Sequence, residues 1–173
     1  MSISCPAPLA GLRIVDLTTG LAGPYCSKLL VAAGAEVIKV ESTIRPDSSR
    51  GGPQPDSHVM GDAWNHGGAY HEVNRNKLGL SLNLNTQRGK DLFKELVSVS
   101  DVVAQNFPPR VMRNFSLDYR ELKKIKRDII VLDSTAYGST GSWQNYIGYG
   151  SSIQAVTGLT YLTGYHGGEP VQG

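Results

Sequence analysis

The sequence predicts an α/β fold: a mainly parallel sheet of about five or six strands with helices on both faces, as in Rossmann-like, doubly wound domains. Short apolar runs alternate along the chain with segments of helical periodicity. The first strand, helix and strand fit within residues 12–41, the size of a βαβ unit. The chain of 173 residues is also long enough to bury one core of ordinary size.

The first predicted unit runs from strand to helix to strand. Residues 12–17, "LRIVDL", are a short β-branched apolar run, typical of a buried strand. Pro24 suits the first turn of the following helix, because its missing N–H would have no partner there. We expect this helix to turn Tyr25 and Leu29 inward. Residues 35–41, "AEVIKVE", predict the second strand, joined by a right-handed crossover.

The rest of the chain predicts further strands and helices in alternation. Strands are expected at residues 78–85, 101–107 and 128–135. Helices are expected at residues 86–100, 110–114, 118–125 and 151–156. Thr86 is placed to cap the first of these helices, whose apolar residues recur at helical spacing: Leu92, Phe93, Leu96 and Val97.

A long aperiodic segment separates the second and third strands. Residues 42–70 are rich in Gly, Pro, Ser and Asp. A loop of this length within a compact domain is usually functional or wraps around a partner. We therefore expect residues 42–73 to form a long loop or a dimer-contact segment.

Composition excludes several classes of protein. A net charge of +2, with no basic run interleaved with aromatic residues, argues against nucleic-acid binding. Cys5 and Cys26 form neither a disulfide framework nor a metal-site pattern, and we expect Cys26 to be buried. No signal peptide or membrane-spanning run is visible. We expect a cytoplasmic protein with no metal site, no nucleic-acid partner and no membrane association.

Ligands of doubly wound sheets bind beyond the carboxyl ends of the strands. This predicts a site lined by residues 18–23 ("TTGLAG"), 105–110 ("QNFPPR") and 134–141 ("STAYGSTG"), with the loop after Glu41. Glu41 follows the glycine-rich turn at the distance of a ribose-binding acid, which suggests NAD. However, the turn reads G-L-A-G-P and lacks the G-x-G-x-x-G pattern. A nicotinamide-dependent enzyme is therefore the less favoured interpretation.

Four segments together resemble the class III CoA-transferases, the CaiB/BaiF family. They are residues 11–41, 74–107, 117–141 and 148–159, which occur in the family's order and cover most of the chain. The resemblance implies a transferase that moves CoA from an acyl-CoA thioester to a carboxylic acid, with CoA as substrate and no prosthetic group. It also implies an attacking Asp, which forms an anhydride and then an enzyme-bound thioester. Full-length members are interlocked homodimers, so the resemblance implies the same here.

The resemblance places the attacking Asp outside this chain. Residues 167–173, "GGEPVQG", match the stretch that precedes it. We therefore expect no catalytic residue here, and a Rossmann-like CoA-binding domain over residues 1–173 that is incomplete at its C-terminus and inactive alone. Whether the chain is a fragment, the ordered part of an enzyme or a split subunit stays open, as do the acyl donor and the acceptor acid.

The resemblance further implies which residues contact CoA. They are Gly20, Leu21, Ala22, Asn74, Arg75, Asn76, Lys77, Asn106, Phe107, Arg113, Thr135, Ala136, Tyr137 and Gly138. Lys77 is the first candidate for a phosphate or pantetheine contact, and the alternative is a solvated lysine at a strand edge. Asn106 and Phe107 could instead form a turn and plug the core.

Several positions depart from the family pattern. Ser42 stands where some members carry an Arg, and a second Arg aligns with Asn114, for which Arg113 could substitute. Leu21 replaces the Gln of formyl-CoA transferases, which argues against that substrate. The related α-methylacyl-CoA racemases have a catalytic His where this chain has Tyr149, and a tyrosine with a pKa near about 10 is a poor base at neutral pH. A racemase-like enzyme and a non-catalytic CoA-binding subunit remain the alternatives.

Overall fold

The computed structural model describes residues 7–51 and 63–171. Its centre is a five-stranded, all-parallel sheet with the strand order β3-β2-β1-β4-β5. The strands are β1 (Arg13–Asp16), β2 (Glu36–Glu41), β3 (Leu78–Ser81), β4 (Val102–Gln105) and β5 (Ile130–Asp133). The predicted fold class and all five predicted strands are confirmed, although each strand is shorter than its apolar run.

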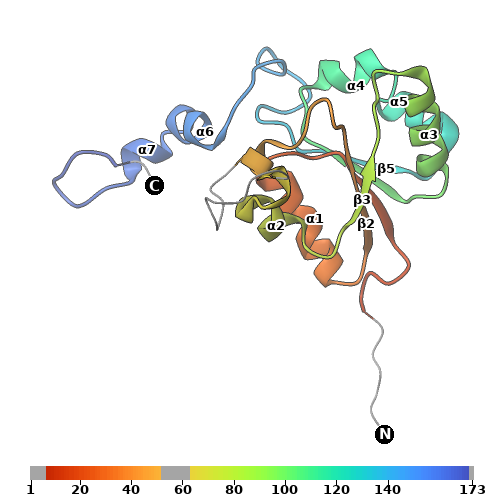
Figure 1. Ribbon diagram of the computed structural model, residues 1–173. Coiled ribbons are helices and arrows are strands. Elements are labelled where there is room, and N and C mark those ends of the chain that lie inside the picture. Colours follow the sequence, from red (N-terminus) through yellow and green to blue (C-terminus); the bar gives the residue numbers. More distant parts are fainter. Residues whose placement is uncertain (1–6, 52–62, 172–173) are drawn as a thin grey trace, which may run out of the picture.

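Helices cover both faces of this sheet. The helices of the described residues are α1 (Ala22–Ala32), α2 (Gly68–Asn74), α3 (Gln87–Ser98), α4 (Pro109–Phe115), α5 (Tyr119–Ile125), α6 (Gly150–Val156) and α7 (Leu159–Leu162), with the 3-10 helices η1 (Ser48–Gly51) and η2 (Ala63–Asn65). Of these, α6 and α7 lie away from the sheet. Helices α1 and α2 lie together on one face, and α3, α4 and α5 lie on the other (Figure 1). The arrangement is doubly wound, as the sequence predicts.

The larger part of the core lies between the sheet and α3, α4 and α5. Phe93 and Val97 of α3 are fully enclosed there, as the helical spacing predicts. Thr86 caps this helix, since its Oγ1 accepts a hydrogen bond of 3.0 Å from Gly89 N. A smaller cluster joins α1 to the opposite face of β1 and β2. The sheet is therefore packed on both faces.

The prediction that Tyr25 and Leu29 of α1 face inward is wrong. Tyr25 and Leu29 are 47% and 53% exposed, and Cys26 is exposed as well. Leu30 and Val31, near the end of the helix, pack against the smaller core cluster, whereas the buried residues of its first turns are small, including Gly23 and Ser27. They are small because the first turns of α1 pass close to the end of β1, where a bulky side chain would not fit.

The segment expected as a loop, residues 42–73, is partly regular. Helices η1 and η2 lie within it and α2 begins at Gly68, while residues 52–62 lie outside the described residues. The expectation of a loop is therefore wrong for residues 68–73. Its role in dimer contacts stays a prediction.

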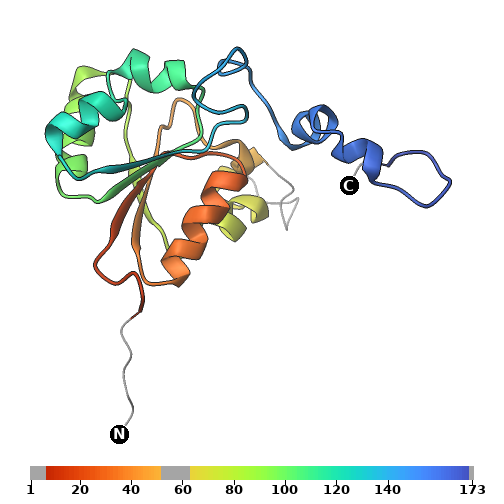
Figure 2. The ribbon, with the colours of Figure 1, turned by 180° about the vertical axis from the view of Figure 1, so that it is seen from behind.

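The C-terminal arm, residues 149–171, extends away from the sheet (Figures 1 and 2). Its helices α6 and α7 pack on each other. Several large apolar side chains along it are exposed, among them Tyr161, Leu162 and Tyr165. In the described ranges, no helix has the length and apolar character needed to cross a membrane.

Candidate functional site

The strand order reverses between β1 and β4, because the chain leaves β1 toward β2 on one side and later returns to pair β4 on the other. Ligands of doubly wound sheets bind at this switch point. The corner loop, residues 17–21, leaves the sheet there after β1, and Asn106 does so after β4. Thr19 N donates to Asn106 Oδ1 (2.9 Å), and Asn106 Nδ2 donates to Thr19 O (2.8 Å). These paired bonds hold the two sides of the switch point together.

Three backbone N–H groups of the corner loop, those of Thr18, Thr19 and Gly20, donate hydrogen bonds to side-chain oxygens. Thr18 N donates to Asp16 Oδ1 (2.8 Å), and Gly20 N donates to Asp47 Oδ1 (3.0 Å). With the Thr19 bond, three consecutive N–H groups are bound by acceptors from three parts of the chain. Gly20 has a φ of +77°, a left-handed conformation that favours glycine. The loop therefore has one fixed shape, and these three amides are not available to a ligand.

The next three backbone amides, at the N-terminus of α1, lack such acceptors among the described residues. Helix α1 begins after Leu21, which has no side-chain oxygen to cap it. The N–H groups of Leu21, Ala22 and Gly23 have no hydrogen-bond acceptor among the described residues. Leu21 is 70% exposed, so solvent reaches this end of the helix. Uncapped N–H groups at a helix N-terminus carry partial positive charge and bind anions such as phosphate.

A buried ion pair supports the corner loop from within the fold. Lys77 Nζ donates to Asp16 Oδ2 (3.0 Å), Asn74 Oδ1 (2.9 Å) and the carbonyl oxygen of Pro24 (2.9 Å). Burial alone would raise the pKa of Asp16, but Lys39 and Lys77 outweigh it and hold that pKa below its ordinary value. Burial lowers the pKa of Lys77, against the opposing charge of Asp16.

A second buried pair lies beside the first. Lys39 Nζ donates to Asp47 Oδ2 (2.9 Å) and to the carbonyl oxygen of Thr18. Burial would raise the pKa of Asp47, but Lys39 and the hydrogen bond from Gly20 N lower it overall. Both carboxylates are thus ionised and neutralised by lysines inside the protein, so they do not repel an anionic ligand at the corner.

The structure contradicts one of the two sequence-based interpretations of Lys77. Its side chain is 1% exposed, so the solvated strand-edge lysine is wrong. A contact with a ligand would require the ammonium to leave three oxygen acceptors, and that contact stays a prediction. Asn74 is buried beside it, whereas Arg75 and Asn76 are exposed. Phe107 packs against the larger core cluster, which favours its interpretation as a core plug.

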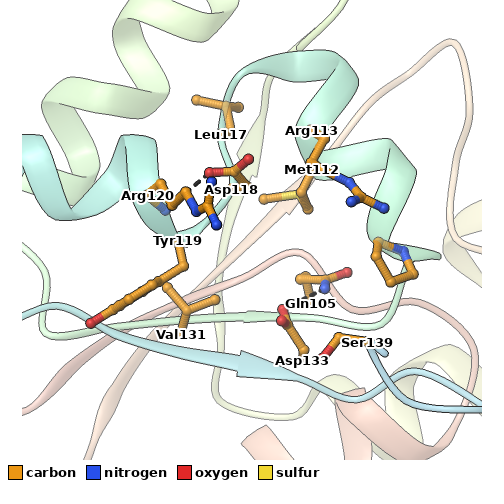
Figure 3. A pocket seen from close by; sticks show the side chains of 11 residues that line it. Gln105, Met112, Arg113, Leu117, Asp118, Tyr119, Arg120, Val131, Asp133 and Ser139 are labelled. Carbon is orange, nitrogen blue, oxygen red and sulfur yellow. Dashed lines mark hydrogen bonds between the residues drawn. The ribbon is translucent and has the colours of Figure 1, made fainter. Parts of the chain in front are cut away.

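Arg113 lies in a separate cavity of about 420 Å³ (Figure 3). This cavity lies beyond the ends of β4 and β5, under α4 and the start of α5, and Arg120 also lines it. Gln105 Nε2 donates to Asp133 Oδ1 (2.6 Å) at its floor. Its lining includes neither Lys77 nor any residue of the corner loop. The predicted contacts therefore fall into two groups that flank the end of β4.

The remaining predicted contacts belong to the loop after β5. Ala136 and Tyr137 pack around Gly148, and Tyr137 also meets Trp143 edge to face with 5.7 Å between ring centres. Gly138 precedes Ser139, which lines the cavity of Arg113. Thr135 has a buried hydroxyl oxygen with no partner within the described part of the chain. Among residues 7–51 and 63–171, no backbone hydrogen bond joins this loop to the corner loop.

The sequence-based reasoning missed Lys39 and Asp47. A signal for Lys39 was present, because a lysine between valine and isoleucine in a buried parallel strand requires a partner. Asp47 lies in an aperiodic segment and gave no such signal. Over the residues that the structure covers, no group of three His, Cys, Asp or Glu side chains could hold a metal ion.

Comparisons with known proteins identify the family of the chain. The chain matches the model of CoA-transferase family III over residues 9–173. It is 38% identical over 164 residues to the beta subunit of succinyl-CoA–L-malate CoA-transferase of Chloroflexus aurantiacus, covering 95% of this chain and 39% of that protein. It is 37% identical over 165 residues to human succinyl-CoA:glutarate CoA-transferase, covering 95% of this chain and 36% of that protein.

A solved structure gives the same result. A CaiB/BaiF family protein from Brucella suis superimposes with a TM-score of 0.85 at 35% identity, over 97% of this chain and 44% of that chain. The chain thus spans less than half of the length of the relatives it matches. Because the match to the family covers nearly all of it, the chain belongs to CoA-transferase family III.

Proposed function

We propose that the protein carrying this chain is a CoA-transferase and that this chain provides its CoA-binding face. The observation that carries the proposal is the uncapped N-terminus of α1 at the switch point of the sheet. CoA carries a 3′-phosphate and a pyrophosphate, and a fixed set of backbone donors at a helix N-terminus suits such groups. Membership of the family supports the choice of CoA over other phosphorylated ligands.

The proposed reaction exchanges CoA between two acids through an enzyme carboxylate. An Asp beyond Gly173 attacks the thioester carbonyl of the donor, which forms a mixed anhydride and releases the CoA thiolate. The thiolate then attacks the aspartyl carbonyl, giving an enzyme thioester and the free donor acid. The acceptor carboxylate attacks this thioester, and the thiolate released adds to the acceptor acyl carbon, which restores the Asp. Throughout, the role of this chain is to hold the CoA.

The proposed donor is a short dicarboxylic acyl-CoA. The names of several similar proteins specify succinyl-CoA as donor, with L-malate or glutarate as acceptor. The acceptor is accordingly proposed as a carboxylic acid of similar size.

We also propose that the protein forms a homodimer in which the C-terminal arm contacts the second chain. The exposed apolar residues along α6 and α7 support this, since such a surface is usually covered by a partner. Size-exclusion chromatography with light scattering tests it. A stable monomer of the complete gene product would contradict it.

The function is tested by titration calorimetry followed by an activity assay. The 173-residue chain should bind CoA and give no heat with NAD. The complete gene product should convert succinyl-CoA and glutarate or L-malate to the new thioester, as measured by liquid chromatography. Binding of NAD without binding of CoA would refute the proposal. Binding of CoA without transfer by the complete gene product would favour a non-catalytic subunit.

A further inference from the structure

Asp47 is fully buried and uses both carboxylate oxygens. Its Oδ1 accepts hydrogen bonds from Gly20 N (3.0 Å), Ser49 N (3.0 Å) and Ser49 Oγ (2.8 Å). Its Oδ2 accepts from Lys39 Nζ (2.9 Å). The carboxylate therefore joins the loop after β2 to the corner loop, which lies 27 residues earlier.

Lys39 completes the same support from the centre of β2. Its ammonium binds Asp47 and also the carbonyl oxygen of Thr18. The Lys39–Asp47 pair thus binds an N–H group and a carbonyl group of the corner loop, on either side of Thr19. Two such fixed points determine the direction in which the backbone enters α1.

From this geometry we infer that Asp47 and Lys39 are positioning residues for CoA. They hold the corner loop so that the free amides of Leu21, Ala22 and Gly23 face the ligand, although neither residue touches it. The inference rests on the proposed CoA-binding role of this chain. Loss of one hydrogen bond from an amide to a charged phosphate weakens binding by about tenfold or more. We therefore expect the pair to act on CoA affinity as well as on stability.

The charge balance of the region allows this to be tested. Asp16, Lys39, Asp47 and Lys77 carry two negative and two positive charges within the fold. Removing only one of them leaves a buried charge unpaired, which is strongly destabilising. Replacing a buried ion pair by apolar residues of similar volume is often neutral or stabilising. The double variant Lys39→Met/Asp47→Leu therefore removes the support while the region stays neutral.

Asp101 provides a matched control. Its carboxylate also accepts from a backbone amide, Arg13 N (2.9 Å), and from a lysine, Lys126 Nζ (2.8 Å). It lies at the opposite end of the sheet, where β4 begins. Asp101→Asn thus alters the same types of hydrogen bond as Asp47→Asn, at a more exposed place with no link to the corner loop.

The experiment measures two quantities in each variant of the 173-residue chain: hydrogen exchange of the Gly20 amide by NMR, and the dissociation constant for CoA by calorimetry. In Asp47→Asn and in the double variant, we expect faster Gly20 exchange and at least about tenfold weaker CoA binding. Asp101→Asn should match the wild type in both.

The possible outcomes separate the inference from the proposed function. A folded double variant that loses Gly20 protection but binds CoA like the wild type would overturn the inference alone. Unfolding of both variants would also overturn it, because the pair would then act on stability only. A wild-type chain that does not bind CoA would remove the proposed function, and the inference with it.

Discussion

Gly23 offers a sharp test of the corner geometry. It is the second residue of α1 and is buried against the corner loop. A Cβ added at this position would lie 2.4 Å from Thr18 Cβ, 2.6 Å from Thr18 Cγ2 and 2.8 Å from Thr18 Oγ1. Ordinary contacts of this kind are 3.4–4 Å, so Gly23→Ala forces the two segments apart by about 1 Å. Thr18 cannot easily move, because its amide is bound to Asp16.

Gly23→Ala should lower both the stability of the fold and its affinity for CoA. Overpacking of this kind costs about 1–3 kcal/mol, and replacing glycine by alanine in a helix returns up to about 1 kcal/mol. The free energy of unfolding should therefore fall by about 0–3 kcal/mol. The free amides of α1 shift with the helix, so the affinity for CoA should fall by at least about tenfold.

Gly150→Ala is the matched control. Gly150 also lies in the first turn of a helix, α6, but nothing lies within 4 Å of its added Cβ. Urea unfolding and calorimetry with CoA measure both variants. Gly150→Ala should bind CoA like the wild type and be no less stable. If Gly23→Ala also kept wild-type affinity and stability, the close packing of α1 on the corner loop would be refuted.

Three further outcomes concern stability. Phe93→Ala should lower the free energy of unfolding by about 3–5 kcal/mol in urea, whereas Val99→Ala at an exposed position should change it by no more than about 0.5 kcal/mol. Thr86→Ala removes the cap of α3 and should cost about 1 kcal/mol, which scanning calorimetry detects as a melting temperature lower by about 2–4 °C. Because the folded-state pKa of Asp47 is lowered, its contribution to stability is complete above its unfolded pKa of about 4 and is lost as pH falls through the lower folded value. Urea midpoints measured from about pH 5 downward should therefore fall less in Lys39→Met/Asp47→Leu than in the wild type, and equal slopes would contradict this.

The strands and α3 could be predicted from sequence because their signals are local. The central strands β1, β2 and β4 are short runs rich in β-branched or apolar residues, as is typical of buried strands in a parallel sheet. The edge strands β3 and β5 are also short and mostly apolar, although they are more exposed. In α3, the apolar residues repeat at helical spacing and Thr86 precedes them. Such patterns depend on residues that are close in the sequence, so they predict these elements without knowledge of the three-dimensional fold.

The inner face of α1 could not be predicted in this way. Tyr25 and Leu29 lie outside, while Ser27 lies inside. Ser27 is buried because its Oγ donates to Asp16 Oδ2 (2.6 Å) across the base of the corner loop. The spacing of apolar residues cannot predict the burial of a polar side chain whose hydrogen-bond partner lies in a strand 11 residues earlier.

The switch point of the sheet could be predicted from the sequence, but the side-chain contacts around it could not. The glycine-rich turn and Asn106 correctly indicated the switch point, because strand order alone brings them together. The environment of Lys77 depends on Asp16, 61 residues away in the sequence. The support of Gly20 depends likewise on Asp47. Pairings of this kind follow from the three-dimensional fold and leave no periodic trace in one sequence.

The most direct test is an NMR titration of the 173-residue chain with CoA, followed through its backbone amides. The account predicts the largest shifts at Leu21, Ala22 and Gly23, with the Gly20 amide still protected from exchange by Asp47. Shifts centred on Arg113 and Arg120, with the corner loop unchanged, would place the ligand in the other cavity and contradict the account.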